Sequence, residues 1–345
     1  MRTSIVKSLI STLLSCSVFS AVSAIGFAGS ASAQDLSNYR LNQVTLAGSH
    51  NTYDKKTDFQ YFSDALSFVQ LVELDVWAGV GKWYVSHSNP IANDNNCPKN
   101  GNAGATRNQD LRSCIDGLRK WHDAHPNHDL VVVKFEFKAG LGNAPSSLDD
   151  LIADIQGNGA AARIPKEWIF KPSDLMCKGW PGNCTSRYAT PEVAIQAGNW
   201  PTIANLRGKF LFLLVPGTVA TGAPSTYADA LRNGSAQIAF PTVFATTSND
   251  PRVDYYGNGS SNAAWTVIFD IQAGRLDDGT VSQSRNAWMA QNNFLILVSD
   301  SQPGGSPVDV AKGRTRLNQV SRDYRANIIS TDQEKTGIPY SFPRP

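Results

Sequence analysis

Eight short runs rich in Val, Ile, Leu and Phe recur along the chain, and segments with helical character separate them. Several runs are apolar at successive positions, as in Leu-Val-Val-Val-Lys, which is typical of strands that are covered on both faces. The alternation of such strands with helices predicts a parallel α/β fold. The predicted strands are residues 43–49, 68–77, 130–137, 209–215, 242–246, 266–272, 294–299 and 327–330.

Eight parallel strands joined by helices predict a single distorted (β/α)8 TIM-type barrel. An open, doubly wound sheet remains the alternative, because periodicity does not prove closure. No linker or change of composition divides residues 34–345, so we expect one catalytic domain. We also expect a hairpin strand at 83–86, helices at 109–122, 147–156, 227–232 and 282–291, and surface loops at 93–105 and 256–262.

The first 33 residues have the pattern of a signal peptide. Arg2 and Lys7 precede an apolar, Ser-rich run that ends at Ala31-Ser32-Ala33. The sequence therefore predicts a secreted protein, extracellular or periplasmic. Without this segment the chain has 29 basic and 29 acidic residues, so its charge gives no reason to expect a nucleic acid, and no protein partner is implied.

The four cysteines after residue 33 fall into two local pairs, Cys97 with Cys114 and Cys177 with Cys184. In an oxidising compartment this spacing predicts two disulfides. A zinc site is the weaker alternative, because neither pair has the C-x-x-C spacing.

Polar residues stand where the predicted strands end, which is where the reactive groups of a parallel barrel gather. They are His50 and Asn51 after the first strand, Glu73 and Asp75 on the second, His87 after the hairpin, Glu136 on the third, and Asp270, Asp300 and Asp332 on later strands.

Glu73 and Asp75 are two residues apart on a strand, so their side chains point to one face and can share a cation. Glu136 would add a third carboxylate and Asn51 an amide oxygen. This all-oxygen set suits Ca²⁺ better than Mg²⁺ and lacks the ligands that zinc prefers. The other interpretation is that the acids make ion pairs with buried basic groups such as Lys134. Lys134 could also contact a substrate phosphate.

His50 and His87 can divide the roles of base and acid beside the cation, as phosphodiester cleavage requires. Three other histidines, His122, His125 and His128, surround Pro126. Because the helix must end at the proline, we expect a solvated turn here rather than a metal cluster.

The sequence resembles the PLC-like phosphodiesterase superfamily and, within it, the secreted calcium-dependent phosphatidylinositol-specific phospholipases C. The resemblance rests on Leu-Ala-Gly-Ser-His50-Asn51-Thr-Tyr, Val-Glu73-Leu-Asp75-Val-Trp, Val-Ser-His87-Ser and Lys-Phe-Glu136. It implies Ca²⁺ ligands at Asn51, Glu73, Asp75 and Glu136. It also implies cleavage of phosphatidylinositol to diacylglycerol and a cyclic or linear inositol phosphate. His50 would stabilise the phosphorane or act as base, and His87 would protonate the leaving group.

The lipid headgroup stays open at this point. Phosphodiesterases of the same superfamily that act on glycerophosphodiesters, sphingomyelin or lysophospholipids also carry His, Glu-x-Asp and His in this order. Outside the superfamily, a barrel glycosidase using Glu73 and Glu136 or a non-catalytic lipid-binding barrel are alternatives. For the phosphodiesterase, the expected partner is a phospholipid at a membrane surface, met by peripheral contact only.

Overall fold

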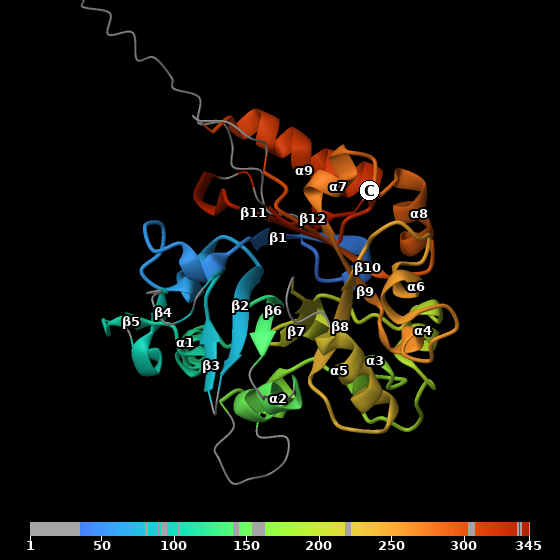
Figure 1. Ribbon diagram of the computed structural model, residues 1–345, viewed down its shortest axis with the longest axis horizontal. Coiled ribbons are helices and arrows are strands. Elements are labelled where there is room, and N and C mark those ends of the chain that lie inside the picture. Colours follow the sequence, from blue (N-terminus) through green and yellow to red (C-terminus); the bar gives the residue numbers. More distant parts are fainter. Residues whose placement is uncertain are drawn as a thin grey trace, which may run out of the picture. The chain divides into compact units, whose positions relative to one another are not determined.

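Within the described residues, eight parallel strands close into a barrel with helices between them, as the alternating pattern predicted (Figure 1). The computed structural model describes residues 35–79, 82–88, 90, 95–102, 104–140, 145–153, 163–217, 222–302, 308–336, 338 and 340–344. These residues belong to one compact unit, 34–345, and the predicted signal peptide lies outside them. The barrel strands are β1 (Val44–Ser49), β2 (Leu71–Gly79), β6 (Val131–Gly140), β7 (Phe210–Pro216), β8 (Ala239–Phe244), β9 (Ile268–Gln272), β10 (Leu295–Ser299) and β11 (Ile328–Thr331).

The barrel is distorted where β1 meets β2. The two strands share a single register pair, Gly48 with Leu71, and the short strand β12 (Phe342–Pro343) runs antiparallel to the start of β1. Ser341 links both sides, because its hydroxyl accepts from Ala47 N at 3.1 Å and donates to Gln70 Oε1 at 2.5 Å. A Cβ at Gly48 would come 3.1 Å from the Cβ of Leu71, so this close approach favours glycine.

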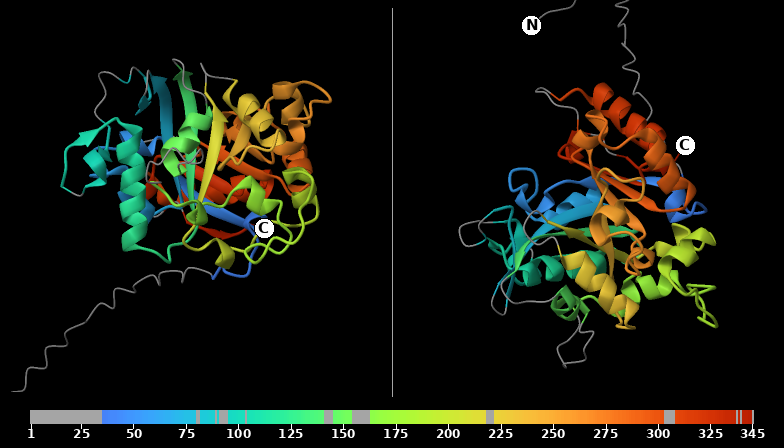
Figure 2. Two further views of the ribbon diagram at one scale, coloured as in Figure 1. Left: turned by 90° about the horizontal axis from the view of Figure 1, so that it is seen from below. Right: turned by 45° about the vertical axis from the view of Figure 1, so that its right-hand side comes forward.

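Helices surround the strands, as Figures 1 and 2 show. They are α1 (Leu111–Ala124), α2 (Pro145–Ala153), α3 (Pro172–Leu175), α4 (Pro191–Gln196), α5 (Ala223–Arg232), α6 (Pro251–Tyr256), α7 (Ala273–Asp277), α8 (Gln283–Gln291) and α9 (Val310–Tyr324). The predicted hairpin strand is β3 (Lys82–Val85), antiparallel to β2, and β4 (Cys97–Pro98) pairs with β5 (Arg107–Asn108). Disulfides join Cys97 to Cys114 and Cys177 to Cys184, as predicted.

The alternation of side chains along β6 shows how the strands place charge inside the barrel. Val131, Val133 and Phe135 are buried in an outer core that also contains residues of α1 and α2. Each buried apolar side chain of this size contributes about 1.5–3 kcal/mol. The residues between them point into the barrel, where Lys134 contacts side chains of β2, β9 and β10. The alternation along β6 therefore places a charged side chain inside the barrel.

Several segments differ from the prediction, and the short helices α3, α4, α6 and α7 were not predicted. β8 spans 239–244 rather than 242–246, and its Pro241 explains why a propensity argument placed the strand later. The segment predicted as a surface loop at 93–105 contains buried residues, among them Asn95, Asn96 and Cys97. Helix α9 was not predicted, because its sequence is polar and contains Gly313.

Candidate functional site

Three carboxylates from the two adjacent strands β2 and β6 lie close together inside the barrel. Asp75 on β2 lies beside Glu136 on β6 in the strand register, and Glu73 precedes Asp75 by two residues on the same face. One oxygen from each of the three lies within 4.8 Å of the others. Glu73 and Asp75 are fully buried, whereas the Glu136 side chain is 16% exposed. The strand alternation thus brings together the acids that the sequence predicted as a set.

Asn51 and Tyr53 complete the oxygen-rich side of this site. Asn51 follows β1 in the left-handed conformation, with φ 48°, which asparagine tolerates better than most residues. Its backbone N–H donates to Glu73 Oε2 at 3.2 Å. The Tyr53 hydroxyl donates to Asp75 Oδ2 at 2.8 Å and lies 3.3 Å from Asn51 Oδ1. Asn51 therefore lies beside the carboxylates, as the predicted ligand set requires.

The electrostatics of the three carboxylates favour a bound cation. Burial raises the pKa of Asp75, and the neighbouring Glu73 and Glu136 raise it further, to about 6. Asp75 Oδ1 is buried and accepts no hydrogen bond from the described residues. A buried acceptor without a partner is costly, and carboxylate and amide oxygens are the ligands that Ca²⁺ prefers. The residues present therefore fit this ion.

Two lysines of β6 differ in their position. Lys134 is almost completely buried, with Nζ at 2.9 Å from both Glu73 Oε1 and Asp270 Oδ2. Burial acts to raise the pKa of Glu73, but Lys134, His50 and the Asn51 N–H together outweigh burial and lower the pKa. This ion pairing is one of the two roles that the sequence left open for Lys134. Lys138 lies four residues further along β6, on the same face. Its Nζ contacts Asp75 Oδ2 at 3.0 Å and Glu136 Oε1 at 2.6 Å.

The two predicted catalytic histidines are each bound to a carboxylate through Nδ1. His50 Nδ1 lies 3.3 Å from Asp332 Oδ1, which Lys55 Nζ also contacts at 2.9 Å. Burial opposes ionisation of Asp332, but the contacts from His50 and Lys55 prevail and hold its pKa at about 2. His87 Nδ1 lies 3.2 Å from Asp75 Oδ2, and the His87 side chain is 63% exposed. In both rings the carboxylate is bound by Nδ1, and Nε2 takes no part in that bond.

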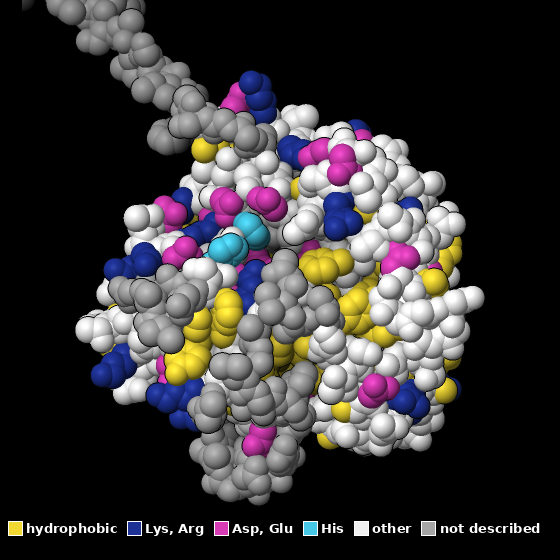
Figure 3. All heavy atoms as spheres, viewed as in Figure 1, with side chains coloured by type: hydrophobic (Ala, Val, Ile, Leu, Met, Phe, Trp, Pro, Cys, Tyr) yellow, Lys and Arg dark blue, Asp and Glu magenta, His cyan; other side chains and the backbone are white. Residues whose placement is uncertain are grey.

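A cavity of about 640 Å³ opens at these residues. Figure 3 shows histidine side chains together with acidic and basic side chains near the centre of this face, with hydrophobic side chains beside them. The cavity is lined by His50, Asn51, Trp77, His87, Ser88, Pro90, Glu136, Lys138, Gln272 and Asp300. Two histidines and a lysine therefore face the same space as Glu136.

The remaining histidines lie near the start of β6, at the other end of that strand. His122 Nδ1 lies 2.9 Å from His128 Nε2, and His125 stacks on Trp121. Two groups of three potential metal ligands occur among the described residues, and neither includes these histidines. One is Glu73, Asp75 and Glu136, and the other is His50, Asp300 and Asp332.

Sequence reasoning did not assign several residues that contact the site. Asp332 was recognised only as a polar strand end, without its bond to His50. Tyr53 stands in the quoted motif, three residues after His50, and this spacing was the available signal. Lys55 and Ser299 gave no local signal, because their partners Asp332 and Asp270 are distant in the sequence.

A solved structure with this arrangement of elements identifies the family. The chain is 31% identical to a Ca²⁺-dependent phosphatidylinositol-specific phospholipase C from Streptomyces antibioticus, with a TM-score of 0.73. The match covers 88% of this chain and 99% of the Streptomyces chain. This chain belongs to the Ca²⁺-dependent phosphoinositide phospholipase C family.

A model of this phospholipase C family, described as "Phosphoinositide phospholipase C, Ca2+-dependent", matches residues 103–251, which include Glu136. Two structures of a calcium-dependent phosphoinositol-specific phospholipase C from Pseudomonas sp share the fold. One is 21% identical with a TM-score of 0.65, and its match covers 89% of this chain and 96% of the other. The second is 22% identical with a TM-score of 0.65, covering 90% and 98%. A search of curated proteins gives no match.

Proposed function

We propose that this phospholipase C cleaves phosphatidylinositol in a Ca²⁺-dependent reaction that gives diacylglycerol and a cyclic or linear inositol phosphate. The observation that carries the proposal is the group of three carboxylates within 4.8 Å of one another, beside the two histidines that line the cavity. Membership of the family supports the substrate class.

Asn51, Glu73, Asp75 and Glu136 would hold the cation. When bound, Ca²⁺ neutralises charge on the phosphoryl oxygens and makes the attacking hydroxyl more acidic. Three carboxylates and an amide favour Ca²⁺ over Mg²⁺, because Ca²⁺ accepts more protein ligands in a less regular geometry. Tyr53 orients this set, since its hydroxyl contacts both Asp75 and Asn51.

His50 and His87 move the protons. With Nδ1 bound to Asp332, His50 presents Nε2 to the cavity and takes the proton of the inositol hydroxyl that attacks phosphorus. His87 gives a proton to the diacylglycerol oxygen as its bond to phosphorus breaks. Lys138 lines the same cavity and adds a positive charge beside the phosphate. Lys134 is buried inside the barrel, where it neutralises Glu73 and Asp270.

We further propose that the protein is exported and meets its lipid at a membrane surface by peripheral contact. The two disulfides are typical of proteins in oxidising compartments. Among the described residues, every helix is too short or too polar to cross a bilayer. Hydrophobic side chains beside the histidines, visible in Figure 3, give the face an apolar region that a lipid surface can cover.

The test offers the purified protein phosphatidylinositol, glycerophosphoinositol, sphingomyelin and lysophosphatidylcholine, each with Ca²⁺ and with a chelator. We expect cleavage of phosphatidylinositol that chelation abolishes. Asp75→Asn should lower the rate by at least about 100-fold, because it removes a ligand charge. Asp116→Asn is the matched control, since this partly buried acid is paired with Arg163 away from the cavity.

Cleavage that persists in chelator would contradict the calcium assignment. If the choline lipids were cleaved as fast as phosphatidylinositol, the proposed selectivity for the inositol headgroup would be wrong. If Asp75→Asn cleaved the lipid as fast as Asp116→Asn, the three carboxylates would have no role in the reaction.

A further inference from the structure

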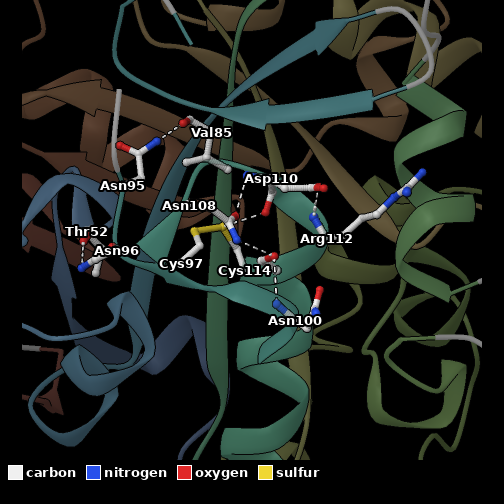
Figure 4. Close-up of a disulfide and its surroundings, with 11 residues drawn as sticks. Thr52, Val85, Asn95, Asn96, Cys97, Asn100, Asn108, Asp110, Arg112 and Cys114 are labelled. Atoms are coloured by element: carbon white, nitrogen blue, oxygen red, sulfur yellow. Dashed lines mark hydrogen bonds between the residues drawn. A yellow bond between two sulfur atoms is a disulfide. The ribbon is translucent and has the colours of Figure 1, made fainter. Parts of the chain in front are cut away.

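A buried segment of three residues lies behind the cation site, in a stretch that the sequence alone suggested was a surface loop. This segment, which we call the strap, consists of Asn95, Asn96 and Cys97, and each residue is at most 1% exposed. Figure 4 shows Asn96 directed at Thr52, Asn95 directed at Val85, and Cys97 joined to Cys114. Asn96 Oδ1 is buried and accepts no hydrogen bond from the described residues, so the backbone and Nδ2 of Asn96 make the bonds that hold it.

Asn96 binds the turn that follows His50. Its backbone N–H donates to the Tyr53 carbonyl at 3.1 Å, and its Nδ2 donates to the Thr52 carbonyl at 3.3 Å. Its own carbonyl accepts from Phe62 N at 3.1 Å. One residue therefore fixes two successive carbonyl groups of the turn Thr52–Asp54 (η2).

The same turn makes the contacts that hold the cation site together. Thr52 Oγ1 accepts from Glu73 N at 3.0 Å, and the Tyr53 hydroxyl donates to Asp75 Oδ2 at 2.8 Å. Asn51, directly before the turn, donates through its backbone to Glu73 Oε2 at 3.2 Å. Any rotation of the Thr52 and Tyr53 peptides would move the oxygens that these bonds align.

The strap is itself held from two sides. Asn95 Nδ2 donates to the carbonyl of Val85, which lies on β3 two residues before His87. The Cys97–Cys114 disulfide joins the strap to α1, with a Cα–Cα distance of 4.7 Å. A link of this kind limits how far the strap can move away from the turn.

We propose that Asn96, anchored by the Cys97–Cys114 disulfide, is a positioning residue for the cation site. It keeps the Thr52–Tyr53 peptides in the orientation that aligns Asn51, Glu73 and Asp75. The inference rests on the proposed function, because it concerns calcium affinity. Residues one step behind the ligands commonly change metal affinity by about 10- to 100-fold when they are replaced.

The test measures calcium binding directly, by titration calorimetry of the whole mature protein without substrate. Asn96→Ala removes the bond to Thr52, and we expect the dissociation constant for Ca²⁺ to rise by about 10-fold. Asn286→Ala is the matched control. Asn286 is also a fully buried asparagine whose Nδ2 donates to a backbone carbonyl, that of Tyr324, but it lies on α8. We expect its dissociation constant to equal the parent's.

If Asn96→Ala does not fold, the double variant Cys97→Ala/Cys114→Ala replaces it, with Cys177→Ala/Cys184→Ala as control. We expect weaker calcium binding in the first and parental binding in the second. An unchanged dissociation constant in the folded strap variant, or an equal loss in its control, would overturn the proposal. A parent protein that binds no calcium would instead refute the proposed function, so the two failures are distinguishable.

Discussion

Asp332 fixes which nitrogen of His50 faces the cavity. Its Oδ1 lies 3.3 Å from His50 Nδ1 and also receives Lys55 Nζ at 2.9 Å, so the carboxylate cannot rotate without breaking both contacts. A carboxylate that accepts from Nδ1 selects the tautomer with a free Nε2 lone pair. His50 then has the form that a proton acceptor needs.

Asp332→Asn tests this arrangement. An amide can donate to Nδ1 and favour the other tautomer, so we expect kcat to fall by at least about 100-fold with little change in KM. The control is Asp300→Asn. Asp300 Oδ1 also lies near His50 Nδ1, but at 3.9 Å it is too far away to form a hydrogen bond. Steady-state cleavage of phosphatidylinositol at saturating Ca²⁺ measures both. Equal losses in the two variants would count against a specific role for Asp332.

The three predicted carboxylates share one physical property, which is that strand alternation determines where they point. Glu73, Asp75 and Glu136 were predicted as a group because residues two apart on a strand share a face. Asp332 and Lys55 could not be joined from sequence, since they are roughly 280 residues apart and no local spacing links them. Their contact exists only because β11 lies beside β1 in the closed sheet.

At the scale of single elements, the least predictable parts are those held by tertiary contacts. Helix α9 has only a narrow buried face, formed by residues such as Leu317 and Val320, and most of its other positions are polar. Asp309 caps it by accepting from Lys312 N. Packing against the barrel compensates for the weak pattern, which explains why periodicity alone did not indicate the helix.

Asp149 joins three elements and makes stability depend on pH. It lies on α2, contacts the Tyr227 hydroxyl on α5, and accepts from Ile238 N at 3.1 Å just before β8. Burial raises the pKa of Asp149 to about 7. The Asp149 carboxyl therefore holds its proton more tightly in the folded state than in the unfolded state. The stability that this protonated carboxyl contributes decreases as the pH rises from about 4 to 7.

Asp149→Asn should remove that dependence. In the parent, the free energy of unfolding should fall by up to about 1.4 kcal/mol per pH unit across this range from Asp149 alone. Urea unfolding at pH 5 and pH 7.5 measures the difference. We expect a smaller difference in Asp149→Asn, whereas the exposed-site variant Asp278→Asn should retain the parental one. Parallel pH profiles for the parent and Asp149→Asn would show that Asp149 does not titrate as stated.

At the scale of the whole molecule, barrel closure depends on the segment around β12. β1 and β2 share one register pair, and the neighbouring gap is bridged by Ser341 and by the pairing of Phe342 and Pro343 with β1. Arg344 adds a bond from its backbone N–H to the Gln43 carbonyl at 2.8 Å. The eight-strand count predicted the barrel, but it gave no sign of this extra strand.

Deletion of residues 341–345 tests the closure. The loss of several hydrogen bonds at about 1 kcal/mol each should lower the free energy of unfolding by about 3 kcal/mol or more. Ser341→Ala should show a smaller loss, about 2 kcal/mol, because it affects only the two bonds to Ala47 and Gln70. Urea unfolding at fixed pH measures both, and an unchanged midpoint in the deletion variant would contradict the role of β12.

The pairing of β1 with β11 and β12 also imposes an order in time. Asn51, Glu73, Asp75 and Glu136 all leave the ribosome early, but the partners that hold β1 in the sheet are synthesised roughly 280 residues later. Until then β1 lacks its partners β11 and β12, and His50 lacks Asp332. A nascent chain that ends before β11 therefore contains every proposed calcium ligand but lacks the contact that orients His50, so we expect it to be inactive.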